Sequence, residues 1–437
     1  MLKKSLALPQ DRENIKELTI TILGNANSGK SSLVGILANP IFSQVADTIL
    51  TSFGAELKDT PEVVPSEILD DGNGKSRNPV LQFIHEQKTG RTSSISYNYL
   101  VLNKGYKVLS FVDLAGHEAY LKTTIRGVTS SYPDFGFICI EKSITYITKE
   151  HIQLLYILGI PFGIIMSKTD LIPKDKIQDN LKKIFRLLKS INLKPYIIKS
   201  QSDLALANTG SVCPVFLMSN KTGAGFDKLI PFVNTIEKKP TKIIPNAFVI
   251  DSIYTVPGFG LIVSGMSGIE IEKGAELVLG PFSNGQDFDF IKVKVRTMHD
   301  DYRNFIDILK PGSRGCLCIK MDAAYKKKLR SGLVLAYKQE NVAPVQKFRA
   351  RIHIFQGTLC TITPGYSAFI NTGIVKGCVK FNTVYSDDDE AAKQQKCIRA
   401  GNTTIAELEF LKNAYCLTPG EIFIFREGRT IGFGEIL

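Results

Sequence analysis

A glycine-rich loop between a strand-like run and a helix-like run constrains the fold of this 437-residue chain more than any other feature. The loop is GNANSGKS at residues 24–31; TITIL precedes it directly, and SLVGILA follows it. Its spacing matches G-x-x-x-x-G-K-[ST], in which successive N–H groups and a helix N-terminus form a cradle for phosphates. Such a loop predicts an α/β domain whose ligand lies at the carboxyl ends of the strands.

The loop and a second strand end together predict a phosphate site. Lys30 would neutralise β- and γ-phosphate oxygens, and the Ser31 hydroxyl would ligate Mg²⁺. In DLAGHE at 113–118, Asp113 would hold Mg²⁺ through a water, and the Gly116 N–H would contact the γ-phosphate. The predicted phosphate-binding residues are Gly24, Asn25, Ala26, Asn27, Ser28, Gly29, Lys30, Ser31, Ser32 and Gly116.

Hydroxyl residues between these two segments predict a switch. GRTSSIS occupies residues 90–96, where a hydroxyl can complete Mg²⁺ coordination only when a γ-phosphate is present. We assign this role to Thr92, with Ser93 and Ser94 as alternatives that the sequence leaves open. The predicted metal ligands are therefore Ser31, Thr92 and Asp113.

Two further strand ends predict recognition of guanine. SKTD at 167–170 places Asp170 where its carboxylate can accept hydrogen bonds from guanine N1–H and N2–H₂, a donor pair that adenine lacks. Lys168 would pack along the base, and SNKTG at 219–223 would bring a backbone N–H near guanine O6. The predicted guanine-binding residues are Ser167, Lys168, Asp170, Ser219, Asn220 and Lys221. Together, these motifs predict a GTPase that binds GTP or GDP with Mg²⁺.

The chain divides into three domains by its sequence pattern. Apolar strand-like runs alternate with amphipathic helices up to EKKPTKIIPN at 237–246, which has the composition of a linker. Within this part, residues 54–78 are rich in acids, Pro and Gly and predict a flexible surface loop. Beyond the linker, short alternating strands with regular turns predict two β-barrels. We expect an N-terminal extension over 1–17, an α/β P-loop domain over 18–240, and all-β barrels over 241–342 and 343–437.

Composition and net charge indicate the kind of partner and the compartment of this predicted GTPase. The net charge of +12 favours a polyanionic partner such as nucleic acid. The eight cysteines are scattered without a C-x-x-C pair, which indicates a reducing compartment rather than disulfides or zinc. No run approaches the roughly 20 apolar residues that cross a bilayer, and the N-terminus lacks the features of a secretory signal. We expect a cytoplasmic protein without a membrane partner.

Residues 18–437 resemble the translational GTPases of the elongation factor Tu superfamily. The likeness lies in DLAGH at 113–117 and VPGFGLIVSG at 256–265; GRTSSIS, LRSGLVL and REGRTIGFGEI are similar to the GTP-binding protein 1 and 2 branch. The resemblance implies a GTPase domain followed by two β-barrels, in a monomer that hydrolyses GTP on the ribosome with tRNA as cargo. Two alternatives stay open: a GTP-dependent adaptor that recruits RNA-degradation machinery for mRNA turnover, and a GTP-dependent scaffold with little hydrolysis.

The resemblance also assigns His117 the catalytic role of positioning the attacking water. We expect the other histidines to be structural or surface residues: His85, His151, His299 and His353. The chain departs from the family pattern at four positions. Asn27 replaces Asp and Ser167 replaces Asn. Ala26 stands where the family often has Val, and Arg91 stands where other members have Ile, on the two sides of the apolar gate around the catalytic histidine, although the GTP-binding protein 1 branch also reads GRTSS. These departures bear on regulated turnover more than on GTP binding.

Overall fold

The computed structural model describes residues 15–52, 64–208, 212–240, 243–284, 287–355, 361–385, 397–427 and 429–437. The chain forms two compact units that are divided between Lys239 and Pro240, inside the expected linker. Most of the expected N-terminal extension and residues 53–63 of the expected loop lie outside the described residues. The first strand already begins at Lys16.

The first unit is built around a seven-stranded sheet in the order β2-β3-β1-β4-β5-β7-β6. Every neighbouring pair is parallel except β2 with β3. The apolar runs that predicted buried strands form β1, β3, β4, β5 and β7, so the predicted α/β fold is confirmed. The strands are β1 (Lys16–Gly24), β2 (Ser96–Leu102), β3 (Lys107–Asp113), β4 (Phe135–Ile140), β5 (Phe162–Met166), β6 (Pro195–Ile197) and β7 (Cys213–Leu217).

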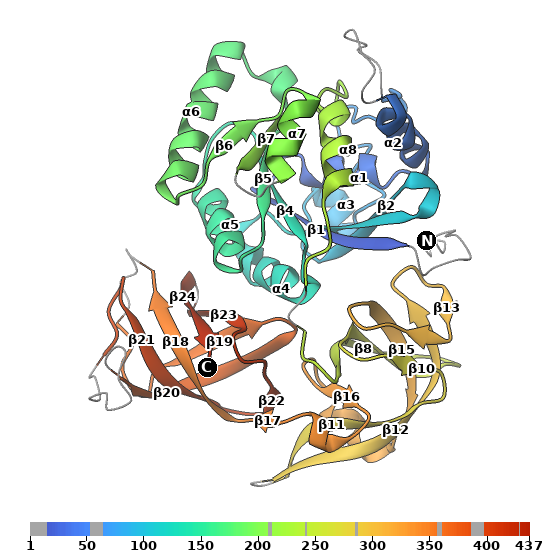
Figure 1. Cartoon of the computed structure of the whole chain (residues 1–437), viewed down its shortest axis with the longest axis vertical. Coiled ribbons are helices and arrows are strands. Elements are labelled where there is room, and N and C mark those ends of the chain that lie inside the picture. The colour runs from blue at the N-terminus through green and yellow to red at the C-terminus, as the bar shows by residue number, and fades with distance from the viewer. Residues whose placement is uncertain are drawn as a thin grey trace. The chain divides into compact units, whose positions relative to one another are not determined.

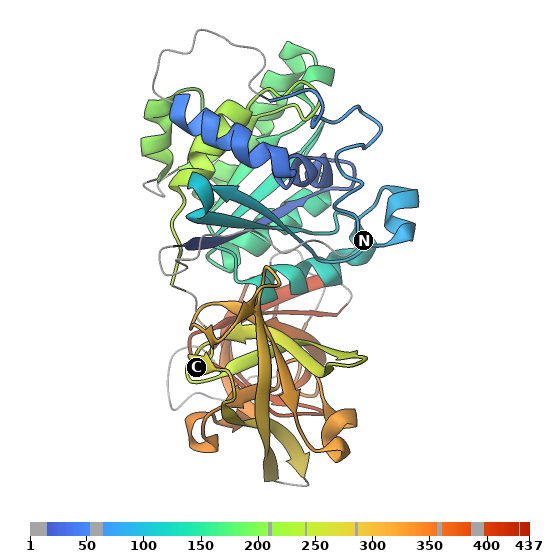
Figure 2. The same cartoon turned by 90° about the vertical axis from the view of Figure 1, so that its right-hand side faces the viewer.

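Helices cover both faces of this sheet. Figure 1 shows α4, α5 and α6 on one face and α1, α2, α7 and α8 on the other. Helix α2 packs against β2 and α8, on the near side of the unit in Figure 2. The helices are α1 (Lys30–Leu37), α2 (Pro40–Ser52), α3 (Ile84–Thr89), α4 (Leu121–Ser131), α5 (Tyr146–Ile157), α6 (Lys174–Ser190), α7 (Gln201–Asn208) and α8 (Phe226–Thr235).

Residues 64–78, which we expected to belong to a flexible surface loop, form a run of turns that packs into the first unit. Three of its apolar side chains are buried in the core of that unit: Val64, Ile68 and Leu69. The Asp70 carboxylate accepts hydrogen bonds of 3.1 Å from the N–H groups of Gly72 and Gly74. Apolar anchors and a carboxylate that bonds its own backbone therefore hold a segment whose composition is typical of a loop.

The second unit contains two antiparallel six-stranded barrels. One closes in the order β11-β16-β8-β9-β15-β12, with β12 paired back to β11 and β13 added beside β12. The other closes in the order β18-β21-β20-β19-β23-β24. Strands such as β18 and β21 alternate buried residues with more exposed ones, and each barrel encloses its own core. The predicted pair of barrels is confirmed.

The strands of the second unit fall on either side of the boundary expected at 342/343. The first barrel region contains β8 (Phe248–Val256), β9 (Gly260–Ser267), β10 (Ile271–Glu272), β11 (Glu276–Asn284), β12 (Asp287–Asp300), β13 (Phe305–Ile306), β14 (Ile308–Leu309), β15 (Arg314–Lys320) and β16 (Val334–Ala336). The second contains β17 (Pro344–Val345), β18 (Lys347–Ile354), β19 (Ser367–Thr372), β20 (Val375–Val384), β21 (Thr403–Phe410), β22 (Tyr415–Cys416), β23 (Ile422–Glu427) and β24 (Arg429–Ile436).

In the described part of the chain, no single helix is long and apolar enough to cross a membrane. Helices α1 and α2 reach the necessary length and composition only as a pair, and they are bent by 80° relative to each other.

Candidate functional site

The backbone conformation of the loop between β1 and α1 requires particular residues at three positions. A β-carbon at Gly24 would lie 2.3 Å from the carbonyl oxygen of Cys139, so no side chain fits there. Gly29, just before α1, has φ +80°. Asn27 has φ +64°, a region that Asn and Asp enter more readily than other residues with side chains. Asn27 in place of the usual Asp therefore keeps the loop conformation.

Lys30 lies buried within the cradle that this loop forms. Its Nζ donates a hydrogen bond of 2.8 Å to the carbonyl oxygen of Asn25. A β-carbon at Gly116 would lie only 2.4 Å from Nζ, so the ammonium sits directly against the segment predicted to contact the γ-phosphate. Burial lowers the pKa of Lys30, and the charge of Asp113 opposes that effect. A bound phosphate would supply the negative charge that favours the ammonium form.

The three predicted metal ligands meet at one point. Ser31 Oγ donates to Asp113 Oδ2 over 2.7 Å and lies 2.9 Å from Thr92 Oγ1, which is 3.3 Å from the same carboxylate oxygen. Asp113 Oδ1 is buried without a hydrogen-bond partner among the described residues. Burial raises the pKa of Asp113, while Lys30 and the two hydroxyls oppose the rise. This oxygen-only donor set with one unpaired oxygen fits Mg²⁺.

No cluster of three His, Cys, Asp or Glu side chains within the described ranges offers another metal site. Seven of the eight cysteines lie in these ranges as free thiols, and Cys360 lies outside them.

The two alternatives to Thr92 are engaged elsewhere. Glu86 Oε1 accepts hydrogen bonds from the N–H groups of Ser93 and Ser94, at 2.7 and 3.0 Å, and from both hydroxyls, at 2.8 and 2.9 Å. His85 Nε2 lies 2.9 Å from Ser93 Oγ. Burial raises the pKa of Glu86, but these hydrogen bonds outweigh it and hold the pKa below the ordinary value. Thr92 is therefore the one hydroxyl of the three that faces the candidate metal site.

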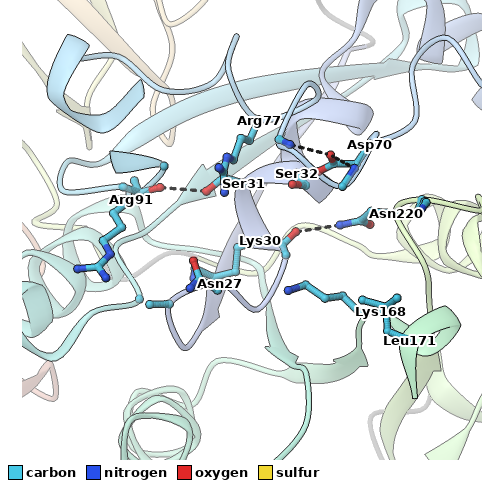
Figure 3. A pocket seen from close by; sticks show the side chains of 18 of the residues that line it. Asn27, Lys30, Ser31, Ser32, Asp70, Arg77, Arg91, Lys168, Leu171 and Asn220 are labelled. Carbon is cyan, nitrogen blue, oxygen red and sulfur yellow. Dashed lines mark hydrogen bonds between the residues drawn. The ribbon is translucent and has the colours of Figure 1, made fainter. Parts of the chain in front are cut away.

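The loops after β5 and β7 are tied to the phosphate loop. Ser167 Oγ donates to the carbonyl oxygen of Ser28 over 2.8 Å. Asn220 Nδ2 donates to the carbonyl oxygen of Gly29 over 3.0 Å, as Figure 3 shows. Ser167 thus makes an anchoring contact although the family usually has Asn at this position. Two separate strand ends fix the backbone that would hold the phosphates.

Asp170 occupies the end of the site predicted to bind guanine. Its Oδ1 accepts a hydrogen bond of 2.6 Å from Ser219 Oγ. Lys168 has φ +55°, and its Nζ lies 3.3 Å from Glu141 Oε1, which orients the side chain predicted to pack along the base. The geometry brings the predicted guanine residues together.

His117 is exposed on the turn that follows β3. Its Nδ1 accepts a hydrogen bond of 3.2 Å from the N–H of Ala119, and its ring lies edge-on to Tyr120 with 6.2 Å between centroids. Because Nδ1 is an acceptor, Nε2 carries the proton of the neutral ring. His117 therefore presents an N–H donor at Nε2.

One cavity of about 360 Å³ joins these elements. Most of the predicted site residues line it: Ala26, Asn27, Gly29, Lys30, Ser31, Ser32, Thr92, Gly116, His117, Lys168, Asp170, Asn220 and Lys221. The others lie behind the lining and hold it in place: Gly24, Asn25, Ser28, Asp113, Ser167 and Ser219. Figure 3 shows this cavity with residues from both its base and phosphate ends.

Sequence reasoning missed part of the lining. Four cavity residues come from the segment expected to be a surface loop: Asp70, Gly72, Gly74 and Arg77. The close spacing of Gly72 and Gly74 beside acids and a basic residue was the available signal, but it is equally typical of a solvent-exposed turn. Gly90, Arg91 and Leu171 also line the cavity.

His151 supports the phosphate loop from within the domain. Its Nδ1 accepts a hydrogen bond of 3.1 Å from the N–H of Gly24. Burial, with a contribution from the charge of Lys30, lowers the pKa of His151 to about 3. His151 is therefore a neutral structural histidine, as expected, and it fixes the point where β1 becomes the loop.

Comparison with known proteins finds a matching family over the first unit. A family described as the elongation factor Tu GTP binding domain matches residues 16–239, more than half of the chain. The chain is 28% identical over 455 residues to GTP-binding protein 1 of Xenopus laevis, covering 96% of this chain and 63% of that protein. It thus spans less than two thirds of that relative.

Two solved structures show the same fold. The GTPase-like domain of Saccharomyces cerevisiae Ski7 bound to GTP has a TM-score of 0.69 and 15% identity, with 97% of both chains covered. Methanococcus maripaludis elongation factor SelB, in complex with the GTP analogue GppNHp, has a TM-score of 0.65 and 18% identity, covering 97% of this chain and 79% of that one. From the family match over more than half of the chain, the protein belongs to the elongation factor Tu GTP-binding domain family.

Proposed function

We propose that this protein hydrolyses GTP to GDP on the ribosome, in the cytoplasm, with tRNA as its cargo. The observation that carries the proposal is the convergence of Ser31, Thr92 and Asp113 beside the cradle of Lys30. This arrangement supports a switch segment that responds to the γ-phosphate. Family membership, the two barrels and the net charge of +12 support a role in translation with RNA as a partner.

Hydrolysis requires the site residues to position groups and to stabilise charge. Mg²⁺, when bound, would neutralise β- and γ-phosphate oxygens. A water oxygen forms a bond to the γ-phosphorus while the bond to the β–γ bridging oxygen breaks, and that electron pair leaves with GDP. The protons of the water pass to phosphate and solvent. His117 would orient this water through Nε2, and Lys30 would offset the growing charge on the bridging oxygen.

Loss of the γ-phosphate gives this site its switch. The Thr92 hydroxyl would then no longer complete the coordination of Mg²⁺, whereas Ser93 and Ser94 would keep their hydrogen bonds to Glu86. The segment over 90–96 would then be released at Thr92 while Glu86 still holds it at Ser93 and Ser94. This supports a nucleotide-dependent change in the surface that a ribosome or another partner reads.

Two departures from the family pattern favour a second candidate, a GTP-dependent scaffold with slow hydrolysis. Ala26 and Arg91 both line the cavity together with His117. By the resemblance, the larger apolar residues Val and Ile at these two positions would form a gate around the histidine. A small side chain and an exposed cation in their place would alter how His117 reaches the water.

GTP hydrolysis with and without ribosomes separates these candidates. Wild-type protein, His117→Ala and a control, His299→Ala in the first barrel, would be compared at equal GTP occupancy. Strong ribosome stimulation that His117→Ala abolishes and His299→Ala retains would support the elongation role. Tight GTP binding without stimulation would refute that role and favour the scaffold, or an adaptor of the RNA-degradation machinery if such components copurify.

A further inference from the structure

Arg77 enters the cavity through a slot between two glycines. A β-carbon at Gly74 would lie 2.3 Å from Arg77 Nε, and a β-carbon at Gly90 would lie 2.5 Å from Arg77 Nη2. Both glycines also have positive φ, +97° and +64°. A side chain at either position would displace the guanidinium, and all three residues line the cavity. The slot is therefore shaped around this one side chain.

The guanidinium of Arg77 has no protein partner in the part of the chain that the structure describes. Its Nε is buried without a hydrogen bond, and no ion pair joins the group to a described acid. By contrast, Arg314 in the first barrel forms an ion pair, and its guanidinium lies 3.3 Å from the Asp251 carboxylate. A buried donor left unpaired costs about 1–3 kcal/mol. The absence of a described partner favours a ligand that supplies the acceptors.

The position of Arg77 indicates which part of the nucleotide it meets. The segment begins at the base end, where the Asp70 N–H donates to the Asn220 carbonyl oxygen over 3.0 Å. It ends against Gly90, two residues before Thr92 in the chain. In Figure 3 the Arg77 side chain extends in the direction of Ser31. The segment thus follows the length of the cavity and places Arg77 at the phosphate end.

The segment is also seated firmly on the helix that follows the phosphate loop. A β-carbon at Gly35 in α1 would lie 1.8 Å from the carbonyl oxygen of Ser76, so the backbone just before Arg77 is in close contact with α1. The same helix carries Ser31 and Ser32 in its first turn. Arg77 is therefore held at a defined place relative to the phosphate cradle.

We propose that Arg77 is an arginine supplied in cis that binds the phosphate chain of GTP and stabilises the charge that develops during hydrolysis. A guanidinium can present two parallel N–H donors to phosphate oxygens, which a lysine cannot do. Arginines in this role raise the rate of phosphoryl transfer by stabilising the transition state. As the γ-phosphorus bond to the β–γ bridging oxygen breaks, negative charge moves onto GDP, and Arg77 would offset it without transferring a proton.

The test uses the full chain without ribosomes, so its outcome does not depend on the proposed role in translation. Arg77→Ala and Arg77→Lys would be compared with Lys75→Ala, which removes an exposed cation from the same segment outside the cavity lining. Affinities for GTPγS and for guanosine would be measured with Mg²⁺ present, together with single-turnover hydrolysis of GTP. Guanosine lacks phosphates, so its affinity reports whether the base end is intact.

Arg77→Ala is expected to lower the GTPγS affinity or the hydrolysis rate by roughly 10- to 100-fold while guanosine affinity stays within about twofold. Arg77→Lys is expected to restore only part of the loss, because it keeps the charge but not the paired donors. If Arg77→Ala has the same GTPγS affinity and the same hydrolysis rate as Lys75→Ala, the proposal is overturned. An equal loss of guanosine affinity would overturn it as well, since Arg77 would then only support the fold.

Discussion

The two ends of the cavity are built differently. At the base end, loops after β5 and β7 are bonded to the phosphate loop through Ser167 and Asn220, whose acceptors are backbone carbonyls. At the switch end, residues 92–94 are held by side chains, with Thr92 bonded toward Ser31 and its two neighbours bonded to Glu86. The base end is therefore built from loops at the strand ends of the sheet, whereas the switch end is a segment held to the rest of the domain by a few side-chain hydrogen bonds.

This difference explains how one cavity can both retain a nucleotide and report its state. Contacts between strand ends persist whether or not the γ-phosphate is present, because they do not involve it. The Thr92 hydroxyl would complete the Mg²⁺ coordination only while the γ-phosphate is present, and loops held by few contacts open more readily than the core. On the proposed function, the base end would set affinity and specificity, and the switch end would set the response to the γ-phosphate.

The largest effect is expected at the base end. Asp170→Asn removes the carboxylate that would accept two guanine donors, each bond being worth about 1.5–3 kcal/mol. GTP affinity should fall roughly 100-fold or more, and xanthosine triphosphate, which lacks the exocyclic amine, should regain part of the loss. Calorimetry with both nucleotides checks this, with Asp175→Asn in α6 as control. Unchanged GTP affinity would mean that this end does not bind guanine.

Glu86→Gln tests the switch end alone. A neutral amide oxygen is a weaker acceptor than the carboxylate, and the amide nitrogen cannot accept from the N–H groups of Gln82 and Phe83, which now donate to Oε2. The bonds to Ser93 and Ser94 should therefore weaken while the phosphate loop stays intact. We expect hydrolysis to fall about 10-fold and amide exchange over 90–96 to accelerate, with GDP affinity changed less than about threefold. Glu67→Gln, an exposed acid, is the control. An equal loss of GDP affinity would break the contrast between the two ends.

His151→Gln sharpens the description of the framework through its pH dependence. The pKa of His151 is about 3 in the folded protein against an ordinary 6.5, so the unfolded chain binds the proton first as pH falls. The free energy of unfolding should therefore decrease by about 1 kcal/mol as the pH is lowered from 6.5 to about 5.5. Gln can still accept from the Gly24 N–H but does not titrate, so denaturant unfolding should lose this slope. His353→Gln, in the second barrel, should leave it unchanged.

Ser167→Ala is expected to have the smallest effect. It removes one buried hydrogen bond to the Ser28 carbonyl, which should cost about 1 kcal/mol in stability of the first unit and reduce GTP affinity a few-fold. Urea unfolding and nucleotide titration measure both. Ser190→Ala, which removes a hydroxyl from the exposed end of α6, serves as the matched change. If the two variants behave alike, Asn220 alone anchors the base end.

Much of this site could be predicted from local sequence because phosphate cradles need particular residues at fixed spacing. Gly24 and Gly29 are required by a close approach and a left-handed φ, and Lys30 and Ser31 follow at positions set by the helix. The apolar runs likewise predicted the parallel strands, since a strand covered on both faces has no polar side to show. These features depend on neighbours within a few residues.

Contacts between distant segments decided the rest. The sequence presents three adjacent hydroxyls at 92–94, and only the folded chain shows that Thr92 turns to Asp113 while the serines turn to Glu86. The composition of 64–78 predicted a loop, yet its packing makes it a wall of the cavity that carries Arg77. The sequence by itself determined the chemistry of the phosphate cradle and the order of the domains. Tertiary structure determined which side chains reach that cradle from afar, because direction and distance across the fold are properties of packing and not of spacing along the chain.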